Sequence, residues 1–397
     1  MRILQISNKA PYPPNDGSSI AIYNVAKGFI ANGIDLHLLT VNTKKHFKED
    51  AHVPDDFKKQ SHYVSVYRDT DVKPAGALLN LFSSESFFVS RFIFKEFEEA
   101  LVKKLKENTF DIIHIEGLFM APYMAVIKKY SKAKITLRAH NVEHLIWDRL
   151  IRNEKSALKK MYLGLQNKRL KKLELEVLKS VDGIVPITAY DKELMEQAGI
   201  RNKYCVSPTG ILLDKYKVQN GQVKVDTFFH LASMDWMPNQ EAVDWFLDNV
   251  WNSYLKDAKG FSVELAGRFM PEKYFQRAEG NLKVTGAVDN NIDFYNHNEV
   301  MIVPLQSGSG MRIKIVEGLA LGKVIVSTSI GAEGIPVTHG ENILIADSPK
   351  EFAEAIKLLI GNKELKEKLS RNARKFIEEQ FDNTKIIAEL IAFYRTL

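Results

Sequence analysis

The sequence predicts an α/β protein with two domains, each built on a parallel β-sheet. The chain of 397 residues is too long for one ordinary hydrophobic core, and two domains of about 150 to 200 residues are the natural division. Short apolar runs of strand length alternate with segments of helical periodicity along most of the chain. Several runs end in glycine or polar residues, as strands do at the ligand-binding edge of a parallel sheet.

Composition limits the class of protein. Hydrophobic residues make up 45% and charged residues 26%, which is typical of a globular protein, and no apolar stretch approaches the ~20 residues that span a bilayer. The amino-terminal residues enter a strand-like run without the apolar segment of a signal peptide. Cys205 is the single cysteine, which excludes an internal disulfide and a cysteine-based metal cluster. These features predict a cytoplasmic protein.

The formal net charge of +6 fits three kinds of partner, namely nucleic acid, an anionic membrane or a phosphorylated substrate. The sequence contains neither a zinc-finger spacing nor an RNP-like aromatic segment. No motif therefore supports a nucleic-acid partner, and we expect none.

The first domain opens with a strand, a loop, a helix and a second strand. Arg2 to Ser7 has a buried-strand pattern, the loop that follows contains three prolines and ends at Gly17, and a helical apolar face then leads to Gly33. The second strand is expected at 36–41. In a parallel sheet Gly17 stands at the ligand-binding end of the first strand, although a plain turn glycine explains the spacing equally well.

The remaining elements of the first domain continue the alternation. Strands are expected at 63–67, 111–115, 135–137 and 183–187, and helices at 92–106, 119–130, 154–180 and 191–198, with a mobile loop at 69–86.

A polar cluster follows the strand at 135–137. It consists of Arg138, His140, Asn141, Glu143 and His144. Side chains at a strand end project into the ligand crevice, so the imidazole of His140 is a candidate for hydrogen-bonding a sugar hydroxyl or a phosphate, and a polar surface loop is the alternative. His140 and His144 have the spacing of a helical metal pair, but no third ligand completes it, and we expect no metal site.

The segment 154–180 predicts a long helix with a basic face. Its apolar stripe is Leu158, Met161, Leu165, Leu170, Leu173 and Leu178. Such a helix fits an anionic membrane surface, but the pattern favours a solvated face above a stripe that packs on the core.

The boundary with a second domain falls in the polar, glycine-containing stretch between Tyr204 and Gln222. Its expected strands are 228–231, 263–266, 282–285, 300–303, 324–326 and 343–346, and its expected helices are 240–251, 311–321, 350–360 and 363–380, before a final helix at 384–394.

The most informative stretch of the second domain is 303–335, VPLQSGSGMRIKIVEGLALGKVIVSTSIGAEGI. It predicts a strand, a glycine loop from Ser307 to Gly310, a helix and another strand. Free N–H groups at a helix start beside glycines form an anion site, so phosphate is the first ligand to suspect, and tight turns are the alternative. The candidates for charged contacts are Arg312, Lys314 and Glu317 within two turns of the glycines, and Arg268 after another strand.

The order of these segments resembles the GT-B glycosyltransferases of the retaining family 4 over nearly the whole chain. The resemblance is carried by PYPPNDGSS, DIIHIEG, RAHNVEH, SPTGILLDKY, LAGR, VTGAVDN and, above all, the stretch 303–335. A dinucleotide-binding dehydrogenase would instead show G-x-G-x-x-G after its first strand, and the loop before Gly17 does not. The resemblance implies two Rossmann-like domains facing across a cleft: an acceptor-side domain at 1–204, a donor domain at 205–380, and a helix at 381–397 that returns to the first domain.

The resemblance also implies how the donor is held. Glu317 matches the second glutamate of the family's Glu-x7-Glu motif, which holds the ribose hydroxyls of the donor, because a carboxylate accepts from two vicinal hydroxyls. The backbone from Gly308 to Met311 would hold the diphosphate. The implied donor-binding set is Gly17, Ser307, Gly308, Ser309, Gly310, Met311, Arg312 and Glu317.

The implied catalytic residues are His140, Arg268 and Lys314. His140 matches the histidine that contacts the transferred sugar, and Gly17 matches a loop glycine close to the diphosphate and the acceptor. Without a metal, cations and oriented N–H groups must stabilise the leaving phosphate, and Arg268, Arg312 and Lys314 are candidates for those cations.

Two positions depart from the family pattern. Ser309 stands where the first glutamate of Glu-x7-Glu is expected, and ASMDWMPNQ stands where an arginine and a lysine are expected after the first strand of the second domain. These departures leave open a variant subgroup or weakened catalysis.

We therefore expect a hexosyltransferase that moves a sugar from a nucleotide diphosphate sugar to an acceptor hydroxyl with retention, in cell-surface polysaccharide or glycolipid synthesis. The expected partners are the nucleotide sugar and a glycan or lipid-linked acceptor, with no metal or other cofactor. The basic helix at 154–180 would allow peripheral contact with the inner face of the membrane. The alternatives are a nucleotide- or sugar-binding protein that lost turnover, which Ser309 favours, and nucleic-acid binding driven by charge alone.

Overall fold

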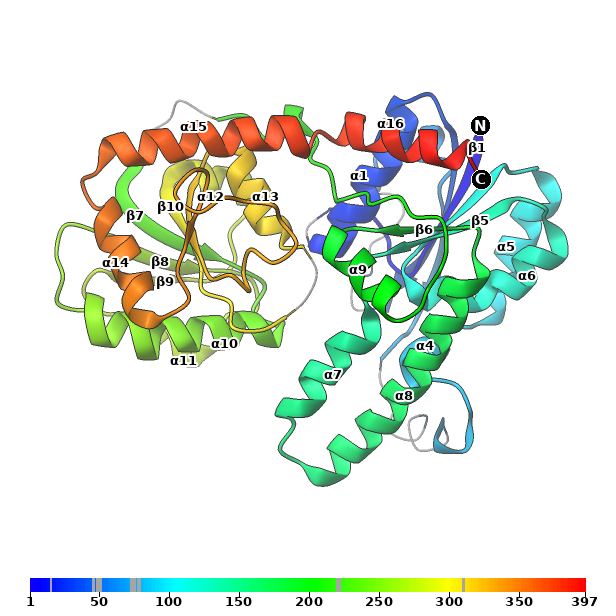
Figure 1. Cartoon of the computed structure of the whole chain (residues 1–397), viewed down its shortest axis with the longest axis horizontal. Coiled ribbons are helices and arrows are strands. Elements are labelled where there is room, and N and C mark those ends of the chain that lie inside the picture. Colours follow the sequence, from blue (N-terminus) through cyan, green and yellow to red (C-terminus); the bar gives the residue numbers. More distant parts are fainter. Residues whose placement is uncertain are drawn as a thin grey trace. The chain divides into compact units, whose positions relative to one another are not determined.

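The computed structural model describes the whole chain except residues 15, 45–46, 48–51, 72–75, 77–79, 219–222 and 309–310. The chain forms two compact units (Figure 1): unit 1 is Met1–Gly210 with Asn383–Leu397, and unit 2 is Ile211–Asp382. The sequence analysis placed the corresponding divisions at 204/205 and 380/381. The predicted α/β class with parallel sheets is confirmed. The proposed donor contacts Ser309 and Gly310 lie outside the described residues.

Unit 1 is built on a parallel sheet with the strand order β3-β2-β1-β4-β5-β6. Its strands are β1 (Arg2–Ser7), β2 (Asp35–Thr43), β3 (Val64–Arg68), β4 (Ile112–Glu116), β5 (Lys134–Ala139) and β6 (Gly183–Pro186). Its helices are α1 (Gly17–Ala31), α2 (Asp55–Gln60), η3 (Asn80–Phe82), α4 (Phe87–Ser90), α5 (Lys95–Glu107), η4 (Leu118–Tyr123), α6 (Met124–Tyr130), α7 (Glu143–Asn153), α8 (Ala157–Ser180), α9 (Ala189–Gln197) and α16 (Asn383–Tyr394).

The alternation of side chains along the strands of unit 1 separates two interiors. On one face of β4, Ile113 and Ile115 belong to a hydrophobic core that also includes Leu101 of α5 and Leu170 of α8. On the other face, His114 and Glu116 point towards α1 and α16, where Phe29 and Tyr394 pack against the imidazole of His114. The sheet therefore has one apolar and one partly polar face.

The carboxyl-terminal helix α16 belongs to unit 1. It packs closely on α1, because a Cβ atom at Gly28 would overlap the side chain of Ile387. Its last turns also cover β6, where a Cβ at Gly183 would come within 3.0 Å of the ring of Phe393. Glycine is thus required on both elements that receive the helix.

Unit 2 contains a second parallel sheet, with the order β12-β11-β10-β7-β8-β9. Its strands are β7 (Lys224–Leu231), β8 (Ser262–Ala266), β9 (Leu282–Thr285), β10 (Asn298–Val303), β11 (Val324–Ser327) and β12 (Leu344–Ile345). Its helices are η5 (Leu213–Lys215), α10 (Met237–Trp245), the π-helical η6 (Phe246–Leu255), α11 (Glu272–Phe275), α12 (Asn291–His297), α13 (Ile313–Ala320), α14 (Pro349–Leu359) and α15 (Lys363–Gln380).

The two sheets share one topology. When the strands of each unit are numbered from its own first strand, both orders become 3-2-1-4-5-6, the doubly wound order of Rossmann-like folds. In such a sheet the strand order reverses between the first and fourth strands, and ligands bind at the carboxyl ends of these strands. The expected ligand positions are therefore the ends of β1 and β4 in unit 1 and of β7 and β10 in unit 2.

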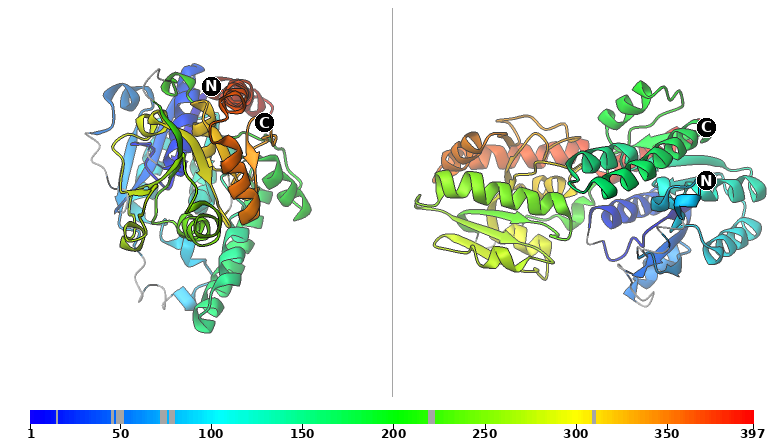
Figure 2. Two further views of the ribbon diagram at one scale, coloured as in Figure 1. Left: turned by 90° about the vertical axis from the view of Figure 1, so that its left-hand side faces the viewer. Right: turned by 90° about the horizontal axis from the view of Figure 1, so that it is seen from below.

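Most predicted elements match the structure within a few residues, but the helix α7 was not predicted. Its residues, EHLIWDRLIRN, begin with Glu143 and His144, the last two members of the polar cluster at 138–144 that was interpreted as the end of a strand. Figure 1 and the left panel of Figure 2 show α7 and α8 extending from the body of unit 1 as an antiparallel pair. In the described parts of the chain, no helix has the length and apolarity needed to cross a membrane.

Candidate active site

A buried carboxylate marks the end of β4 in unit 1. The side chain of Glu116 has no exposed surface. Its backbone pairs in register with Ser7 at the end of β1 and with Arg138 near the end of β5. Glu116 therefore lies at the point where the strand order of this sheet reverses.

The two oxygens of Glu116 accept hydrogen bonds from four side chains. Gln5 Nε2 lies 2.8 Å and His114 Nε2 3.0 Å from Oε1, and Arg138 Nη1 lies 3.3 Å and His140 Nε2 2.6 Å from Oε2. Burial alone would raise the pKa of this carboxyl, but Arg138, His114 and His140 hold the pKa well below its usual value. Glu116 is thus a permanent anion at the centre of the cluster.

His140, the predicted sugar contact, is oriented by this anion. It follows β5 directly, and 17% of its side chain is exposed, in contrast to the fully buried Glu116. Because a carboxylate only accepts hydrogen bonds, Nε2 of His140 is the protonated nitrogen in this pair. This leaves Nδ1 as the ring atom available to a ligand. A carboxylate that fixes the tautomer and orientation of a histidine is a recurring device in catalytic sites.

Side chains at this strand end were expected to project into a ligand crevice. Arg138 does not. Its side chain is fully buried, and its guanidinium contacts Glu116 and, through Nη2, Thr209 Oγ1 at 3.2 Å. Strand alternation places Arg138 over the sheet beside Glu116, where it compensates the buried charge. Its role is structural support for the carboxylate.

The two histidines of the polar cluster bind different carboxylates. His144 Nδ1 lies 2.6 Å from Glu174 Oε2 in α8, whereas His140 contacts Glu116. Glu174 also accepts the backbone N–H groups of Glu143 and His144 and so caps the start of α7. The spacing that suggested a metal pair therefore reflects two separate hydrogen bonds.

Gly17, a predicted donor contact, is the first residue of α1. The preceding Asp16 caps this helix in a reciprocal arrangement with Ser19, and its Oδ2 also accepts Lys9 Nζ at 2.5 Å. The helix start therefore carries a carboxylate with its own counter-ion. Gly17 itself is exposed at the carboxyl end of β1.

In unit 2 the glycine loop leads from β10 into α13, as predicted. Gly308 has a φ of 113°, and a Cβ atom there would come within 2.9 Å of the indole of Trp236 and of the guanidinium of Arg312. Glycine is required both by this backbone conformation and by the close approach. Ser307 Oγ donates to Glu241 Oε2 in α10, and Met311 is buried.

The loop after β7 supplies two further contacts to this region. Arg312 is buried, with 5% of its surface exposed. Its guanidinium carbon lies 5.7 Å from the centre of the Trp236 ring, which is a cation–π geometry. Asn239 in α10 accepts Lys314 Nζ at 3.0 Å and donates to the carbonyl of Ser233 at 2.8 Å. The segment ASMDWMPNQ, which lacks the expected arginine and lysine, therefore contacts Arg312 at the start of α13 and Lys314 within it.

Lys314 and Glu317 lie on successive turns of α13 and titrate near neutrality. Burial lowers the pKa of Lys314 to about 7, with a further contribution from the charge of Arg312. Burial raises the pKa of Glu317 to about 7, against the hydrogen bond from Tyr216 and the charge of Lys314. Tyr216 donates its hydroxyl to Glu317 Oε1 at 2.7 Å.

His230 lies beside this pair at the end of β7. Its Nδ1 donates to the carbonyl of Ile302 in β10 at 2.9 Å, and burial, with the charge of Lys314, lowers its pKa to about 3. His230 is therefore neutral at physiological pH. The sequence analysis did not single it out, because it falls inside an apolar strand.

Arg268, the third predicted cation, follows β8. Its carbonyl accepts the N–H of Met234 at 2.9 Å, and at the adjacent Gly267 a Cβ atom would overlap the carbonyl oxygen of Ala232. The loops after β7 and β8 are thus joined, with Arg268 on one and Trp236 on the other. All three predicted cations come from the ligand-binding edge of the unit 2 sheet.

Among the described residues, Asp35, His37 and His62 are a group whose ligand atoms lie within 4.8 Å of one another. The second oxygen of Asp35 accepts Arg2 Nε at 2.5 Å, and Lys104 Nζ donates to the carbonyl of His62 at 2.9 Å. The group lies at the amino-terminal end of β2, opposite the ligand-binding edge. Two neighbouring cations disfavour a metal ion there.

Two family models match the chain. The model described as Glycosyltransferase Family 4 matches residues 15–215, which is 201 of the 397 residues. The chain belongs to glycosyltransferase family 4. The second model, described as Glycosyl transferases group 1, matches residues 226–362. Both halves of the predicted resemblance are therefore confirmed at the level of a GT-B glycosyltransferase.

Relatives and solved structures of this glycosyltransferase agree with the family. An uncharacterized 44.6 kDa protein in the cps region of Klebsiella pneumoniae is 25% identical over 98% of each chain. The capsular polysaccharide biosynthesis glycosyltransferase CapM of Staphylococcus aureus is 30% identical over 29% of this chain and 31% of its own. Sucrose-phosphate synthase from Thermosynechococcus elongatus has the same fold, with a TM-score of 0.71, 15% identity, and coverage of 100% of this chain and 98% of its own. Anabaena HepE, solved in complex with UDP, gives a TM-score of 0.69 at 14% identity with full coverage of both chains.

Proposed function

We propose that this glycosyltransferase moves a hexosyl group from a nucleotide diphosphate sugar to a hydroxyl of a glycan or lipid-linked acceptor, with retention at the anomeric carbon, in the synthesis of a cell-surface polysaccharide. The observation that carries the proposal is the start of α13. A glycine loop leads into a helix that is preceded by Arg312 and holds Lys314 and Glu317, at the point where the strand order of the unit 2 sheet reverses. The names of the cps-region and capsular relatives support the polysaccharide class.

Unit 2 is proposed to bind the donor. The Glu317 carboxylate would accept the vicinal ribose hydroxyls, and Lys314 with Arg312 would face the diphosphate. A pKa near 7 suits both groups to this task, because an anionic ligand returns the proton to Lys314 and hydroxyl donors favour the ionised carboxylate. Arg268 would add a further cation at the same edge of the sheet.

Unit 1 is proposed to hold the transferred sugar and the acceptor through His140 and the loop that ends at Gly17. Glu116 fixes the ring of His140, and Nδ1 would accept a sugar hydroxyl. In the proposed reaction the bond between the anomeric carbon and the phosphate oxygen breaks, and the acceptor oxygen bonds to the same face of that carbon. The proton of the acceptor passes to the departing phosphate oxygen. No group outside the two substrates is required for this balance.

The proposal is tested by incubating the purified protein with UDP, GDP, ADP and dTDP sugars. We expect nucleotide sugars of one base to raise the melting temperature, since a ligand that binds only the native state stabilises it. We also expect the protein to release the free nucleotide slowly from these sugars. Both effects should disappear in Glu317→Ala, and the release alone should disappear in His140→Ala. Glu354→Ala is the matched control, because Glu354 is an exposed carboxylate of the same unit.

The outcomes separate the alternatives. If no nucleotide sugar stabilises the protein or is consumed, the donor assignment is wrong. Stabilisation without turnover in the presence of extracted glycans or lipid-linked acceptors would identify the nucleotide-binding alternative. The configuration of the product at the anomeric carbon, determined by NMR, tests retention.

A further inference from the structure

The helix pair α7–α8 carries apolar residues that the fold does not cover. Leu158 is 77% exposed, Met161 71%, Leu165 39%, and Leu150 of α7 42%. The three residues of α8 have the spacing of one helical stripe. This corrects the sequence interpretation, which favoured a stripe packed on the core along the whole helix.

The covered and uncovered halves of the stripe are sharply divided. Leu170 and Leu178 are 0% and 2% exposed and belong to the core of unit 1. The change falls near Leu165, and on the amino-terminal side of this residue α8 extends away from the body of unit 1 (Figure 1). Core packing therefore explains the carboxyl-terminal half of the stripe and leaves the half at the tip unexplained.

The exposed half is held in a fixed position by contacts at the base of the pair. Asn167 Nδ2 in α8 donates to the carbonyl of His144 at 3.0 Å and to Asp148 Oδ1 at 2.7 Å, which ties α8 to α7. Trp147 stacks on Phe88 with ring centres 3.8 Å apart and an interplanar angle of 8°. The tip is thus presented by an anchored pair of helices.

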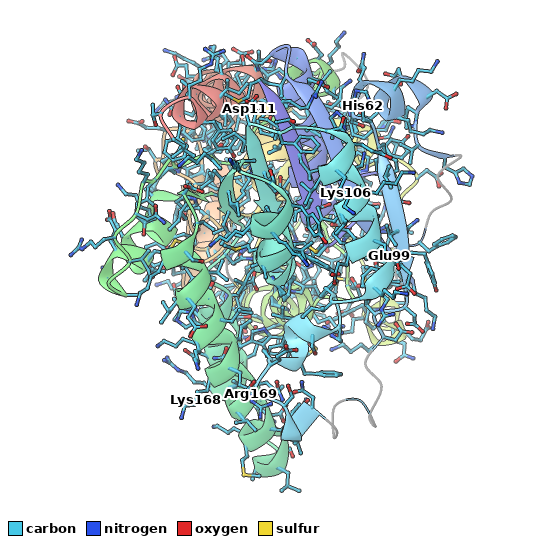
Figure 3. All side chains as sticks on the ribbon, turned by 90° about the vertical axis from the view of Figure 1, so that its right-hand side faces the viewer. His62, Glu99, Lys106, Asp111, Lys168 and Arg169 are labelled. Carbon is cyan, nitrogen blue, oxygen red and sulfur yellow. The ribbon has the colours of Figure 1, made fainter. Side chains whose placement is uncertain are left out.

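Arg169 adds a tie to the segment before α4. Its guanidinium donates to the carbonyls of Asn80 at 2.9 Å and of Leu81 at 3.0 Å. Its neighbour Lys168 is exposed and projects away from the ribbon in Figure 3, where both residues are labelled on α8. Arg169 therefore anchors the helix, whereas the side chain of Lys168 is exposed to solvent.

The tip of the pair is rich in cations. Residues 149–160 carry five positive side chains and one negative, a net charge of +4, from Arg149, Arg152, Lys155, Lys159 and Lys160 against Glu154. Glu154 is already paired with Lys159, whose Nζ lies 2.6 Å from its Oε2. Exposed apolar side chains together with a net positive charge are typical of a segment that inserts into the headgroup region of an anionic bilayer.

We propose that the tip of the α7–α8 pair, formed by Leu150, Leu158, Met161 and Leu165 with the cations of 149–160, docks on an anionic phospholipid bilayer. A second copy of the chain is a poorer occupant, because two tips of charge +4 repel each other. The apolar side chains insert into the bilayer, and the cations are attracted to the lipid phosphates. Because salt screens this attraction, the binding weakens as salt is added.

The docking connects to the site through α7, a point that rests on the proposed function. This helix starts three residues after His140, and its 11 residues span about 16 Å at 1.5 Å per residue, so its far end lies about that far from its start. A membrane-bound tip would hold the acceptor half of the enzyme at that height. The arrangement suits an acceptor whose reacting sugar stands above the lipid phosphates.

The proposal is tested with vesicles of phosphatidylcholine alone and of phosphatidylcholine with phosphatidylglycerol in equal parts. We expect co-sedimentation only with the anionic vesicles, and at least a tenfold loss of affinity in L158S/M161S and in K155Q/K159Q/K160Q. The matched controls are Leu358→Ser, whose leucine is 53% exposed on α14, and K95Q/K103Q/K106Q on α5, and both should bind as the wild type does.

Insertion itself is measured with a fluorescent label. Burial raises the pKa of Cys205, the single native thiol, to about 11, so Leu158→Cys can be labelled selectively near neutral pH with an environment-sensitive dye. We expect a blue-shifted emission with anionic vesicles and none for the same label at Leu358→Cys.

Three results would overturn the proposal. These are wild-type affinity in both tip variants, equal binding to phosphatidylcholine alone, or a wild-type dimer that L158S/M161S dissociates in light scattering, which would make the tip an interface between copies. The nucleotide-dependent melting shift is measured on the same variants without vesicles. It should remain unchanged, so a failure of docking is distinguishable from a failure of the proposed function.

Discussion

Replacement of Glu317 by glutamine separates the stability of unit 2 from its proposed use. Burial raises the pKa of the Glu317 carboxyl from 4.5 to about 7. The difference between a pKa of 4.5 and one of about 7 corresponds to roughly 3 to 4 kcal/mol, because a tenfold change in an equilibrium constant is worth about 1.4 kcal/mol. The ionised carboxylate therefore costs the folded protein about 3 kcal/mol above pH 7.

The sign of the pH dependence follows from proton binding. A carboxyl whose pKa is raised in the folded state favours folding below its unfolded pKa, and this contribution is lost as the pH rises through about 7. Glutamine keeps the shape and the acceptor for Tyr216 but never ionises. Glu317→Gln should therefore be more stable than the wild type by up to about 3 kcal/mol at pH 8, and by less than about 1 kcal/mol near pH 4.5.

The assay is urea unfolding of both proteins at these two pH values, with nucleotide binding measured by calorimetry on the same samples. The stabilised variant should lose the binding, because an amide no longer offers two anionic acceptors to the ribose hydroxyls. Glu354→Gln on the exposed face of α14 should change neither quantity.

Two results would refute this reasoning. If the stability difference between Glu317→Gln and the wild type is the same at both pH values, burial does not control the ionisation of this carboxyl. If the variant binds nucleotide as tightly as the wild type, Glu317 does not hold the ribose. The first result leaves the donor assignment standing, and the second leaves the electrostatic argument standing.

Three further predictions concern other residues of the two units. In calorimetry, nucleotide affinity should pass through a maximum near pH 7, because Glu317 gains its charge and Lys314 loses its proton over the same range, and Lys314→Gln should bind more weakly and lack the fall above pH 7. Glu116→Gln should reduce turnover about 100-fold and destabilise the fold by about 3 to 5 kcal/mol in urea, because it leaves Arg138 buried without its counter-charge; an unchanged unfolding midpoint would contradict this. Gly267→Ala should lower the free energy of unfolding by at least about 2 kcal/mol, since its Cβ would meet the carbonyl of Ala232, and a wild-type melting temperature would refute the close approach.

The fold was predictable because its signals are local. Buried parallel strands appear in the sequence as apolar runs. The glycine loop before α13 indicates the end of a strand and the start of a helix within a few residues. The same local signal placed Glu317 and Lys314 on one helix. The resemblance to family 4 then gave these residues roles that periodicity alone does not provide.

The supporting residues were not predictable, because they depend on which strands are neighbours. Glu116 meets Gln5, Arg138 and His140 only because β1, β4 and β5 are adjacent in the sheet. In the sequence it is one acidic residue at the end of an apolar run. Similarly, nothing local indicates that Trp236 faces Arg312 across two loops.

The covered length of α8 shows a different limit of periodicity. A helical stripe states which residues share a face, but not how far the neighbouring surface extends. The stripe of this helix is continuous from Leu158 to Leu178, and the core ends near Leu165. Only the structure separates the residues that stabilise unit 1 from those that are free to meet a bilayer.

The two clusters use buried charge in opposite ways. In unit 1, Glu116 is fully compensated, and its pKa lies well below the usual value, so the cluster is already organised before any ligand arrives. In unit 2, Lys314 and Glu317 titrate near 7 because burial is incompletely compensated. A ligand that carries phosphates and vicinal hydroxyls supplies the missing compensation to both groups at once. Ligand binding at unit 2 should therefore change the protonation of Lys314 and Glu317, whereas ligand binding at unit 1 should leave Glu116 ionised as it already is.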